Sequence, residues 1–433
     1  MTPTAFAAQL PRLSKYDPGA VGEGSLDPMG VAAVADRIAE LLAPGLRARM
    51  SNPRFVTLSA VGAYAGMRHL GKVAGDGSTT GDIAFEWVAV EALVRGPGAK
   101  DLVGLPGTRK ARLANAVGER LNPGNYLRGP RVFGFTGVYR PFSIDSGVLE
   151  GDGMPGARAE ELVMAWETDQ QLKGFLAETP GTAGARLRQE AGKYIGDALR
   201  KGESSFPPTG WASYEIARTM TPNGAMRRES EVLRRLVLDP QHEVRHTLAS
   251  LLAENLPPSR VGEHEIADVL LPKADGQVRD LLMAAAAYER CATLLTNTFR
   301  RLLRYAVANG HGVLKHQERG SLPFANQAAA GVPDLVQAAI DATARVSDHL
   351  AVDVEFVFQA FTSRQPTDTF VDELITRHAT VQAAKGKRTW LDELRDGCYV
   401  RPPYRDQLVA DDNDSWIHPM RLGTIANFLA ATQ

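Results

Sequence analysis

Apolar side chains recur at spacings of three and four along most of the chain, which predicts a protein built mainly of α-helices. In residues 31–42, Val31, Val34, Ala35, Ile38 and Leu41 fall on one helical face, and Pro44 with Gly45 ends the pattern. Similar patterns predict further helices over 55–70, 83–95, 108–121, 157–176, 183–201, 225–238, 243–254, 278–308, 333–361 (as one helix or two), 388–395 and 419–431.

One segment departs from helical spacing. Residues 131–139 read RVFGFTGVY, in which aromatic and β-branched residues alternate with glycines. Such residues favour strands, and a glycine within a strand marks a bulge or a turn. We therefore predict a strand or hairpin at 131–139, with Gly134 and Gly137 in a tight hairpin or bulge, where glycine tolerates positive φ.

Breaks in these patterns divide the chain into four predicted segments. They are an N-terminal helical region (1–99), a basic segment with a winged-helix-like order of elements (100–150), a helical domain (157–320) and a C-terminal helical region (321–433). The third segment holds a HEAT-like helix pair, because two Val-Arg pairs in similar contexts lie 34 positions apart. The predicted fold class is a mainly α, multi-domain protein with one small winged-helix-like α/β element.

Composition narrows the class of protein. The chain has 433 residues, of which 44% are hydrophobic and 23% charged, a balance typical of soluble globular proteins. No run approaches the roughly 20 apolar residues of a membrane-spanning helix, and no secretory leader opens the sequence. Cys291 and Cys398 are too few for a disulfide framework. These features predict a cytoplasmic protein with reduced thiols and no membrane partner.

A match to the zinc-peptidase pattern HExxH occurs at residues 242–246, which read HEVRH. Two histidines one helical turn apart can bind one zinc ion, with Glu243 as general base for a metal-bound water. His242 and His246 would be ligands, with His264 or Glu265 as the third. Pro240 places the motif at the start of a helix, and Arg245 inserts a charge before the second histidine. We favour the structural interpretation, with no cofactor, and keep a zinc-dependent hydrolase as the alternative.

Other catalytic motifs are absent from the sequence. It contains no glycine-rich phosphate loop ending in Gly-Lys-Ser/Thr and no Gly-x-Ser-x-Gly elbow. Both absences argue against P-loop nucleotide hydrolysis, kinase activity and serine hydrolysis. We therefore favour a binding protein over an enzyme.

Charge is distributed unevenly along a chain whose formal net charge is −1. Residues 100–142 carry eight basic against two acidic side chains, or +6, whereas 143–178 carry eight acidic against two basic, or −6. A local basic face can bind phosphate even in a nearly neutral protein. The predicted nucleic-acid-binding residues are Arg109, Lys110, Arg112, Arg120, Arg128, Arg131 and Arg140.

The order of elements in the basic segment suits a winged helix, in which a helix enters a DNA groove and a hairpin contacts phosphates. Thr108, Asn125 and Tyr126 would add neutral phosphate contacts. The alternative is that these arginines pair with the acidic segment or solvate a helix face.

Three short stretches resemble an uncharacterised class of bacterial proteins encoded in phage-defence gene clusters. They are residues 41–55 with Pro44-Gly45 and Arg54-Phe55, residues 134–139 (GFTGVY) and residues 418–422 (HPMRL). The resemblance implies a role beside a helicase, nuclease or methyltransferase in an antiviral complex. The predicted function is a non-catalytic adaptor that binds duplex DNA and protein partners; a zinc-dependent hydrolase and a protein–protein scaffold are the alternatives.

Overall fold

The chain divides into two compact units, each built from discontinuous stretches of sequence. The computed structural model describes residues 27–96, 98–102, 104–204, 210–258, 261–406 and 415–433. Unit 1 comprises residues 1–38 and 279–418, and unit 2 comprises 39–278 and 419–433. The first 26 residues of the predicted N-terminal region lie outside the described residues. The predicted four segments are each continuous in sequence, whereas each unit of the structure combines a long stretch with a short one from the other end of the chain.

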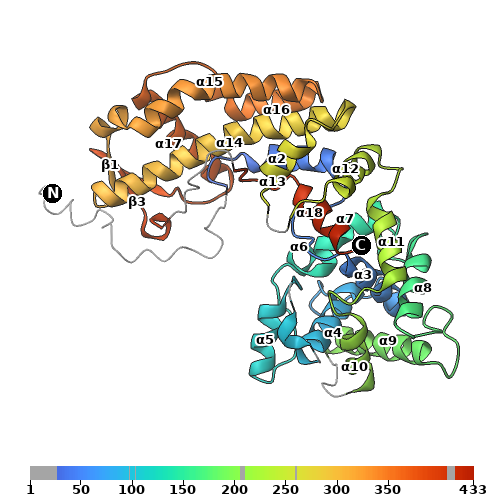
Figure 1. Cartoon of the computed structure of the whole chain (residues 1–433). Helices are drawn as coiled ribbons and strands as arrows, with labels where there is room; N and C mark the ends of the chain where they lie inside the picture. The colour runs from blue at the N-terminus through green and yellow to red at the C-terminus, as the bar shows by residue number, and fades with distance from the viewer. Residues whose placement is uncertain (1–26, 97, 103, 205–209, 259–260, 407–414) are drawn as a thin grey trace, which may run out of the picture. The chain divides into compact units, whose positions relative to one another are not determined.

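Helices make up most of both units, which confirms the mainly α fold class (Figure 1). Unit 2 contains α3 (Arg54–Gly66), η1 (Met67–His69), α4 (Gly81–Arg95), η2 (Ala99–Asp101), α5 (Thr108–Ala116), α6 (Pro130–Phe133), α7 (Phe135–Asp145), α8 (Ala159–Asp169), α9 (Ala183–Lys201), α10 (Trp211–Thr219), α11 (Arg227–Val237), α12 (Glu243–Glu254), α13 (Glu263–Leu270) and α18 (Leu422–Ala430).

The core of unit 2 forms around α3 and α4. Helix α3 packs against α4, α7, α8 and α9, and Phe55 stacks on Phe135 with ring centroids 5.8 Å apart. Every residue from Ile83 to Val94 of α4 is buried. A helix buried on all sides belongs to the interior of a domain. Helix α4 therefore carries any polar side chain within this range into the core.

The C-terminal helix α18 completes unit 2. It packs against α11, α12 and α13, and Phe428 meets Phe142 of α7 edge to face at 5.5 Å. Before the helix, Arg421 adopts φ +68° and its guanidinium bonds Glu40 at 2.6 Å. The last residues of the chain are thus part of a core formed mostly by residues 39–278.

Unit 1 is also helical and includes a small sheet. Its elements are α2 (Ala32–Leu42), α14 (Gly276–Asn309), β1 (Val313–Lys315), η3 (His316–Ser321), α15 (Pro323–Ala344), α16 (Asp348–Phe358), η4 (Gln359–Phe361), α17 (Thr367–Ala384), β2 (Leu391–Leu394), β3 (Gly397–Val400) and η5 (Pro402–Tyr404). A few residues at one end of α2 and of α14 belong to unit 2. The sheet has the order β1-β3-β2 with antiparallel neighbours.

Aromatic rings bring together distant parts of unit 1. Phe299 of α14 stacks on His378 of α17 at 4.6 Å, and Trp390 stacks on Tyr404 at 4.7 Å. His378 accepts a hydrogen bond from the Trp390 backbone N–H, so its Nδ1 donates to the Pro28 carbonyl. Burial lowers the pKa of His378 to about 4, because the apolar surroundings disfavour the charged ring.

The strand predicted at 131–139 is wrong, because the segment forms helices α6 and α7. Pro130 begins α6, a position at which proline is favoured. Gly134 has φ −78°, and a Cβ there would lie 2.0 Å from Glu86 Oε1. A Cβ on Gly137 would lie 2.1 Å from the Arg131 carbonyl carbon. Both glycines permit close helix packing and neither has positive φ.

The helix predicted at 388–395 is also wrong, because part of it forms strand β2. Leu391 pairs with Val400 and Leu394 with Gly397. The motif Leu-Asp-Glu-Leu fits a short helix or a strand, and the partner strand decides between them. The small β element therefore lies in unit 1, and among the described residues of 100–150 no strand is present.

Candidate nucleic-acid interface

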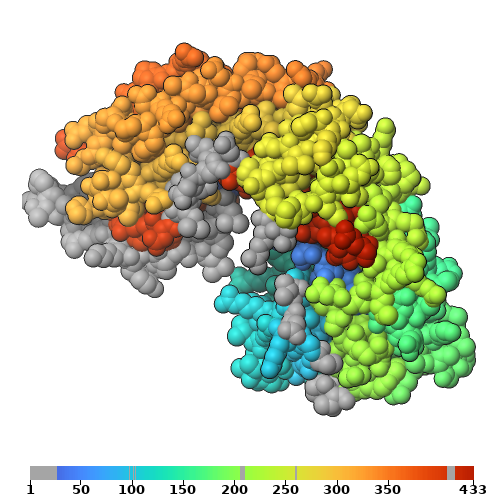
Figure 2. Space-filling view, viewed as in Figure 1, coloured from blue at the N-terminus to red at the C-terminus, as the bar shows by residue number. Residues whose placement is uncertain are grey.

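Helix α5 presents three basic side chains outward. Its inner face is anchored by Ala111 and Ala114, which are both buried. Arg109, Lys110 and Arg112 are exposed. Since residues three apart lie together on a helix, Arg109 and Arg112 share one face, and both line a surface hollow of about 440 Å³. Figure 2 shows the segment around α5, in cyan, as part of the exposed surface of unit 2.

The loop before α5 is fixed by a close contact with Tyr126. Gly107 has φ +80°, and a Cβ there would lie 2.2 Å from the tyrosine oxygen. Tyr126 is buried and donates a hydrogen bond to Glu86 at 2.7 Å. It was predicted to contact phosphate from the surface, and this prediction is wrong because its hydroxyl is committed to the core.

Arg128 and Arg131 form a second basic group. Both side chains are exposed, and both line one cavity of about 470 Å³. Arg131 donates to the Thr80 hydroxyl at 3.1 Å, a neutral partner that leaves its charge uncompensated. In the α5 group, Arg112 likewise donates to a neutral group, the Ala99 carbonyl, at 2.6 Å. Arg109, Lys110 and Arg128 have no ion pair within the described part of the chain.

Two of the predicted contact residues have structural partners instead. Arg120 pairs at 3.2 Å with Glu91, whose carboxylate also accepts from the Leu121 backbone and the Ser204 hydroxyl. Burial raises the pKa of Glu91, and these hydrogen bonds and Arg120 counteract it in part. Arg140 lies 3.7 Å from Asp82. The uncompensated charges therefore lie on α5 and around residues 128–131.

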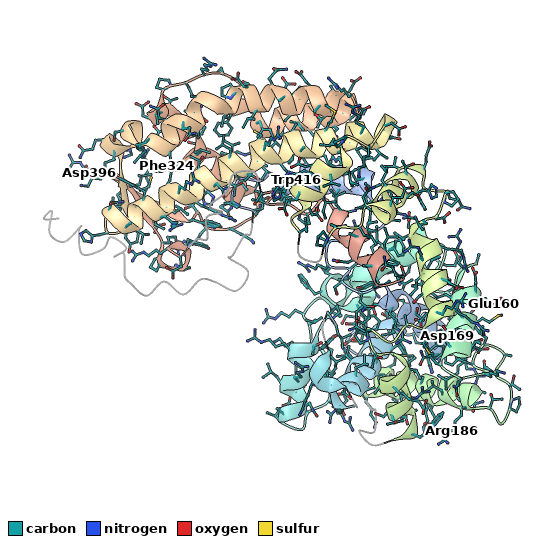
Figure 3. All side chains as sticks on the ribbon, viewed as in Figure 1. Glu160, Asp169, Arg186, Phe324, Asp396 and Trp416 are labelled. Carbon is teal, nitrogen blue, oxygen red and sulfur yellow. The ribbon has the colours of Figure 1, made fainter. Side chains whose placement is uncertain are left out.

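The acidic segment 143–178 does not neutralise this basic surface. Its ion pairs are made with arginines from elsewhere: Asp145 with Arg245, Glu161 with Arg235, and Glu178 with Arg68 and Arg188. Asp169, labelled in Figure 3, accepts from the backbone N–H of Glu229 at 3.0 Å. Among the described residues, no ion pair joins the two segments of opposite charge.

The HEVRH motif begins α12 with its two histidines directed to different partners. His242 Nε2 lies 3.2 Å from Asp145, and His246 Nδ1 lies 2.8 Å from the Leu238 carbonyl oxygen. Glu243 is exposed, and Glu265 accepts from the Gly262 backbone N–H at 2.8 Å. Across the described ranges, no group of three or more His, Cys, Asp and Glu side chains is arranged to hold a metal ion.

Arg245, inside the motif, has a structural role. It is fully buried, donates to the Pro44 carbonyl at 2.7 Å and pairs with Asp145. Its guanidinium also lies 5.3 Å from the centre of the Phe142 ring. The charge that interrupts the motif therefore connects α12 to α7 and to the end of α2.

Sequence reasoning missed two buried polar clusters near α3 and α4. Glu86 accepts hydrogen bonds from Tyr126 and from the Thr136 backbone. Arg54 pairs with Glu229 through two bonds of 3.1 Å, and both side chains are buried. A carboxylate inside the apolar run 83–90 could have indicated that Glu86 is buried. Nothing in the sequence near Arg54 could have indicated its partner, because Glu229 is 175 residues away.

Comparison of the chain with protein-family models, curated proteins and solved structures found no match. Among the described residues, no helix is both long and apolar enough to cross a membrane.

Proposed function

We propose that unit 2 binds the phosphate backbone of duplex DNA through α5 and residues 128–131. The observation that carries the proposal is the exposure of Arg109, Lys110 and Arg128 without carboxylate partners in the described chain. On α9 and α11, four exposed arginines instead have acidic partners, whereas Arg228 has none in the described chain; the four are Arg186, Arg200, Arg227 and Arg235. Basic side chains that contact phosphate release counterions, so binding weakens as salt rises.

The helical form of 131–139 changes the expected mode of binding. A winged helix needs a hairpin beside its helix, and this surface has helices α6 and α7 in that place. The proposal is therefore limited to backbone contacts, which position a protein on DNA without reading its sequence. The resemblance of 41–55, 134–139 and 418–422 to phage-defence proteins supports a non-catalytic subunit that acts with a helicase, nuclease or methyltransferase.

The proposal is tested by measuring binding to a fluorescent duplex at several salt concentrations. In Arg109→Gln/Lys110→Gln/Arg112→Gln, affinity should fall and the slope of log K against log salt should decrease by up to about three. The loss should be similar for duplexes of different sequence. The matched control is Arg200→Gln/Arg227→Gln/Arg235→Gln, which removes the same charge from α9 and α11.

Equal effects of the two triple variants, both folded by circular dichroism, would show that net charge and not this surface governs binding. Absence of salt-dependent binding by the wild-type chain would reject the proposal. In that case the scaffold alternative predicts that the same basic surface binds an acidic protein.

A further inference from the structure

An aromatic ring, that of Phe133, is exposed on the surface of unit 2 with a guanidinium over it. Phe133 is the last residue of α6 (Figure 1), and 48% of its surface is exposed. The guanidinium carbon of Arg49 lies 4.8 Å from the centre of the ring. Arg49 precedes α3, so the two residues come from parts of the chain 84 positions apart. Together the ring and the guanidinium form the Phe133–Arg49 platform.

The charge of Arg49 is not compensated by an acidic side chain. Arg49 is exposed and makes no ion pair within the ranges that the structure describes. By contrast, Arg186 lies over the Trp211 ring at 4.2 Å and pairs with Glu190 at 2.8 Å. A cation over a ring is held in place by the ring electrons, which do not neutralise its charge. The platform therefore offers a fixed positive charge to an external anion.

Exposure alone does not distinguish Phe133 from other rings. Tyr214 and Phe356 are more exposed, at 53% and 66%, but in the described chain no guanidinium lies over either ring. Phe133 also shares its segment with Arg128 and Arg131, whose charges are likewise uncompensated. Of these three rings, Phe133 is the one that combines a flat apolar surface with surrounding positive charge.

This combination fits an unpaired nucleotide. Bases of single strands stack on aromatic rings and on guanidinium planes, and basic side chains bind the phosphates between them. A base inside a closed duplex cannot stack on the protein, because neighbouring base pairs cover both of its faces. An acidic peptide would satisfy the arginines without supplying a flat group for the ring, whereas every nucleotide carries both a planar base and a phosphate.

We propose that the Phe133–Arg49 platform stacks an unpaired base of a DNA strand, while Arg128 and Arg131 contact phosphates of the same strand. The inference rests on the proposed function and adds one contact with a base to its backbone contacts. It assigns a role to Arg49, which lies outside the basic segment 100–142. The platform accepts any base, because every base has a flat face, and it favours DNA whose strands are separated.

Binding of the full chain to three fluorescent probes of equal length provides the test. They are a thymidine single strand, the same backbone with abasic sites in place of every base, and a closed duplex. Phe133→Leu should weaken single-strand binding about tenfold, since one base–aromatic stack is lost. Affinity for the abasic strand and the duplex should not change, because neither presents a base to the ring. The salt slope should also stay as in wild type, because Phe133 carries no charge.

Two substitutions at Arg49 separate stacking from charge. Arg49→Lys keeps the charge and loses the plane, so it should weaken single-strand binding about threefold and leave the other two probes near wild type. Arg49→Gln should weaken binding of all three probes and lower the salt slope for the single strand by up to about 0.7. Phe356→Leu, at an exposed ring without a guanidinium, is the matched control and should change none of these values.

Two results would overturn the inference. One is that Phe133→Leu, folded by circular dichroism, affects the single strand no more than the abasic strand; Arg49→Lys gives the same comparison if Phe133→Leu does not fold. If the α5 triple variant still weakens duplex binding in that case, the base contact fails and the proposed DNA surface stands. The other is that the folded wild-type chain binds none of the probes, which rejects both proposals and leaves the exposed ring to a protein partner.

Discussion

Glu86 is a carboxylic acid in the core of unit 2. Its side chain has no exposed surface, and it accepts from the Tyr126 hydroxyl at 2.7 Å and the Thr136 backbone at 2.9 Å. Burial raises the pKa of Glu86 to about 7, because removal from water disfavours the charged form more than the two hydrogen bonds favour it. Near neutral pH the residue is therefore divided between its protonated and ionised forms.

This pKa predicts a loss of stability as pH rises. The folded pKa of Glu86 lies above the ordinary value of 4.5, so its stabilising contribution is complete below about 4.5 and disappears as pH rises through about 7. The difference between the two values corresponds to roughly 3 kcal/mol of unfolding free energy. Glu86→Gln stays neutral, so urea denaturation between pH 5 and about 8 should show a growing advantage for this variant. A constant difference across that range would contradict the raised pKa.

At the scale of elements, the glycines of 134–137 allow α7 to pack against α6 and against α4. A Cβ on Gly137 would lie 2.1 Å from both carbonyl atoms of Arg131, which are backbone and can move little. By contrast, a Cβ on Gly66 at the end of α3 would make only an ordinary contact, 3.6 Å from Ile195. The two positions differ in how closely neighbouring atoms approach the place of a Cβ. They do not differ in needing a left-handed backbone, because neither has positive φ.

Substitution by alanine should therefore destabilise the protein at Gly137 and have little effect at Gly66. Gly137→Ala forces α6 away from α7 and should lower the unfolding free energy by about 1–3 kcal/mol despite the better helix propensity of alanine. Gly66→Ala should stay within about 1 kcal/mol of wild type or stabilise the protein. Chemical denaturation of both variants checks this. Equal stability of the two would contradict the packing role assigned to Gly137.

At the scale of the whole molecule, the two ends of the chain belong to different units. Lys385 of unit 1 bonds the Asp27 side chain at 3.2 Å, and Tyr288 donates to the Val31 carbonyl at 2.6 Å. In unit 2, Arg234 donates to the Leu429 carbonyl at 3.1 Å, and Gly423 donates to Glu263. Each unit is therefore closed by a short segment that is distant in sequence from the rest of its core.

Removal of the Phe428 ring from the terminal helix α18 should lower the stability of unit 2 and leave that of unit 1 unchanged. Phe428 is buried against Phe142, and Phe428→Ala should cost about 3–5 kcal/mol of unit 2 stability. Hydrogen exchange should accelerate in α7, α11 and α12, while protection in α15 and α17 stays as in wild type. Val352→Ala, at a position 61% exposed on α16, is the control and should change neither pattern. Equal acceleration in both units would show that their stabilities are coupled.

The sequence by itself determined where most helices lie. The patterns at 183–201 and 243–254 coincide with α9 and α12, and that at 31–42 with α2 to within one residue. Helical periodicity and end signals act over a few residues, so they can be recognised without knowledge of the fold. Exposure of Arg109, Lys110 and Arg112 was predictable for the same reason, because Ala111 and Ala114 mark the opposite face of the helix.

Tertiary structure decided which polar groups are available for function. Glu86 is buried and accepts from the backbone of Thr136 in the segment 131–139. Arg120 pairs with Glu91, and Arg140 pairs with Asp82. The cavity that contains Trp87 and Arg131 joins segments 44 positions apart. Such pairings depend on which faces meet when helices pack, and the same aromatic and glycine residues at 131–139 are compatible with strand or helix until α4 lies against them. Local patterns carry no information about these distant partners.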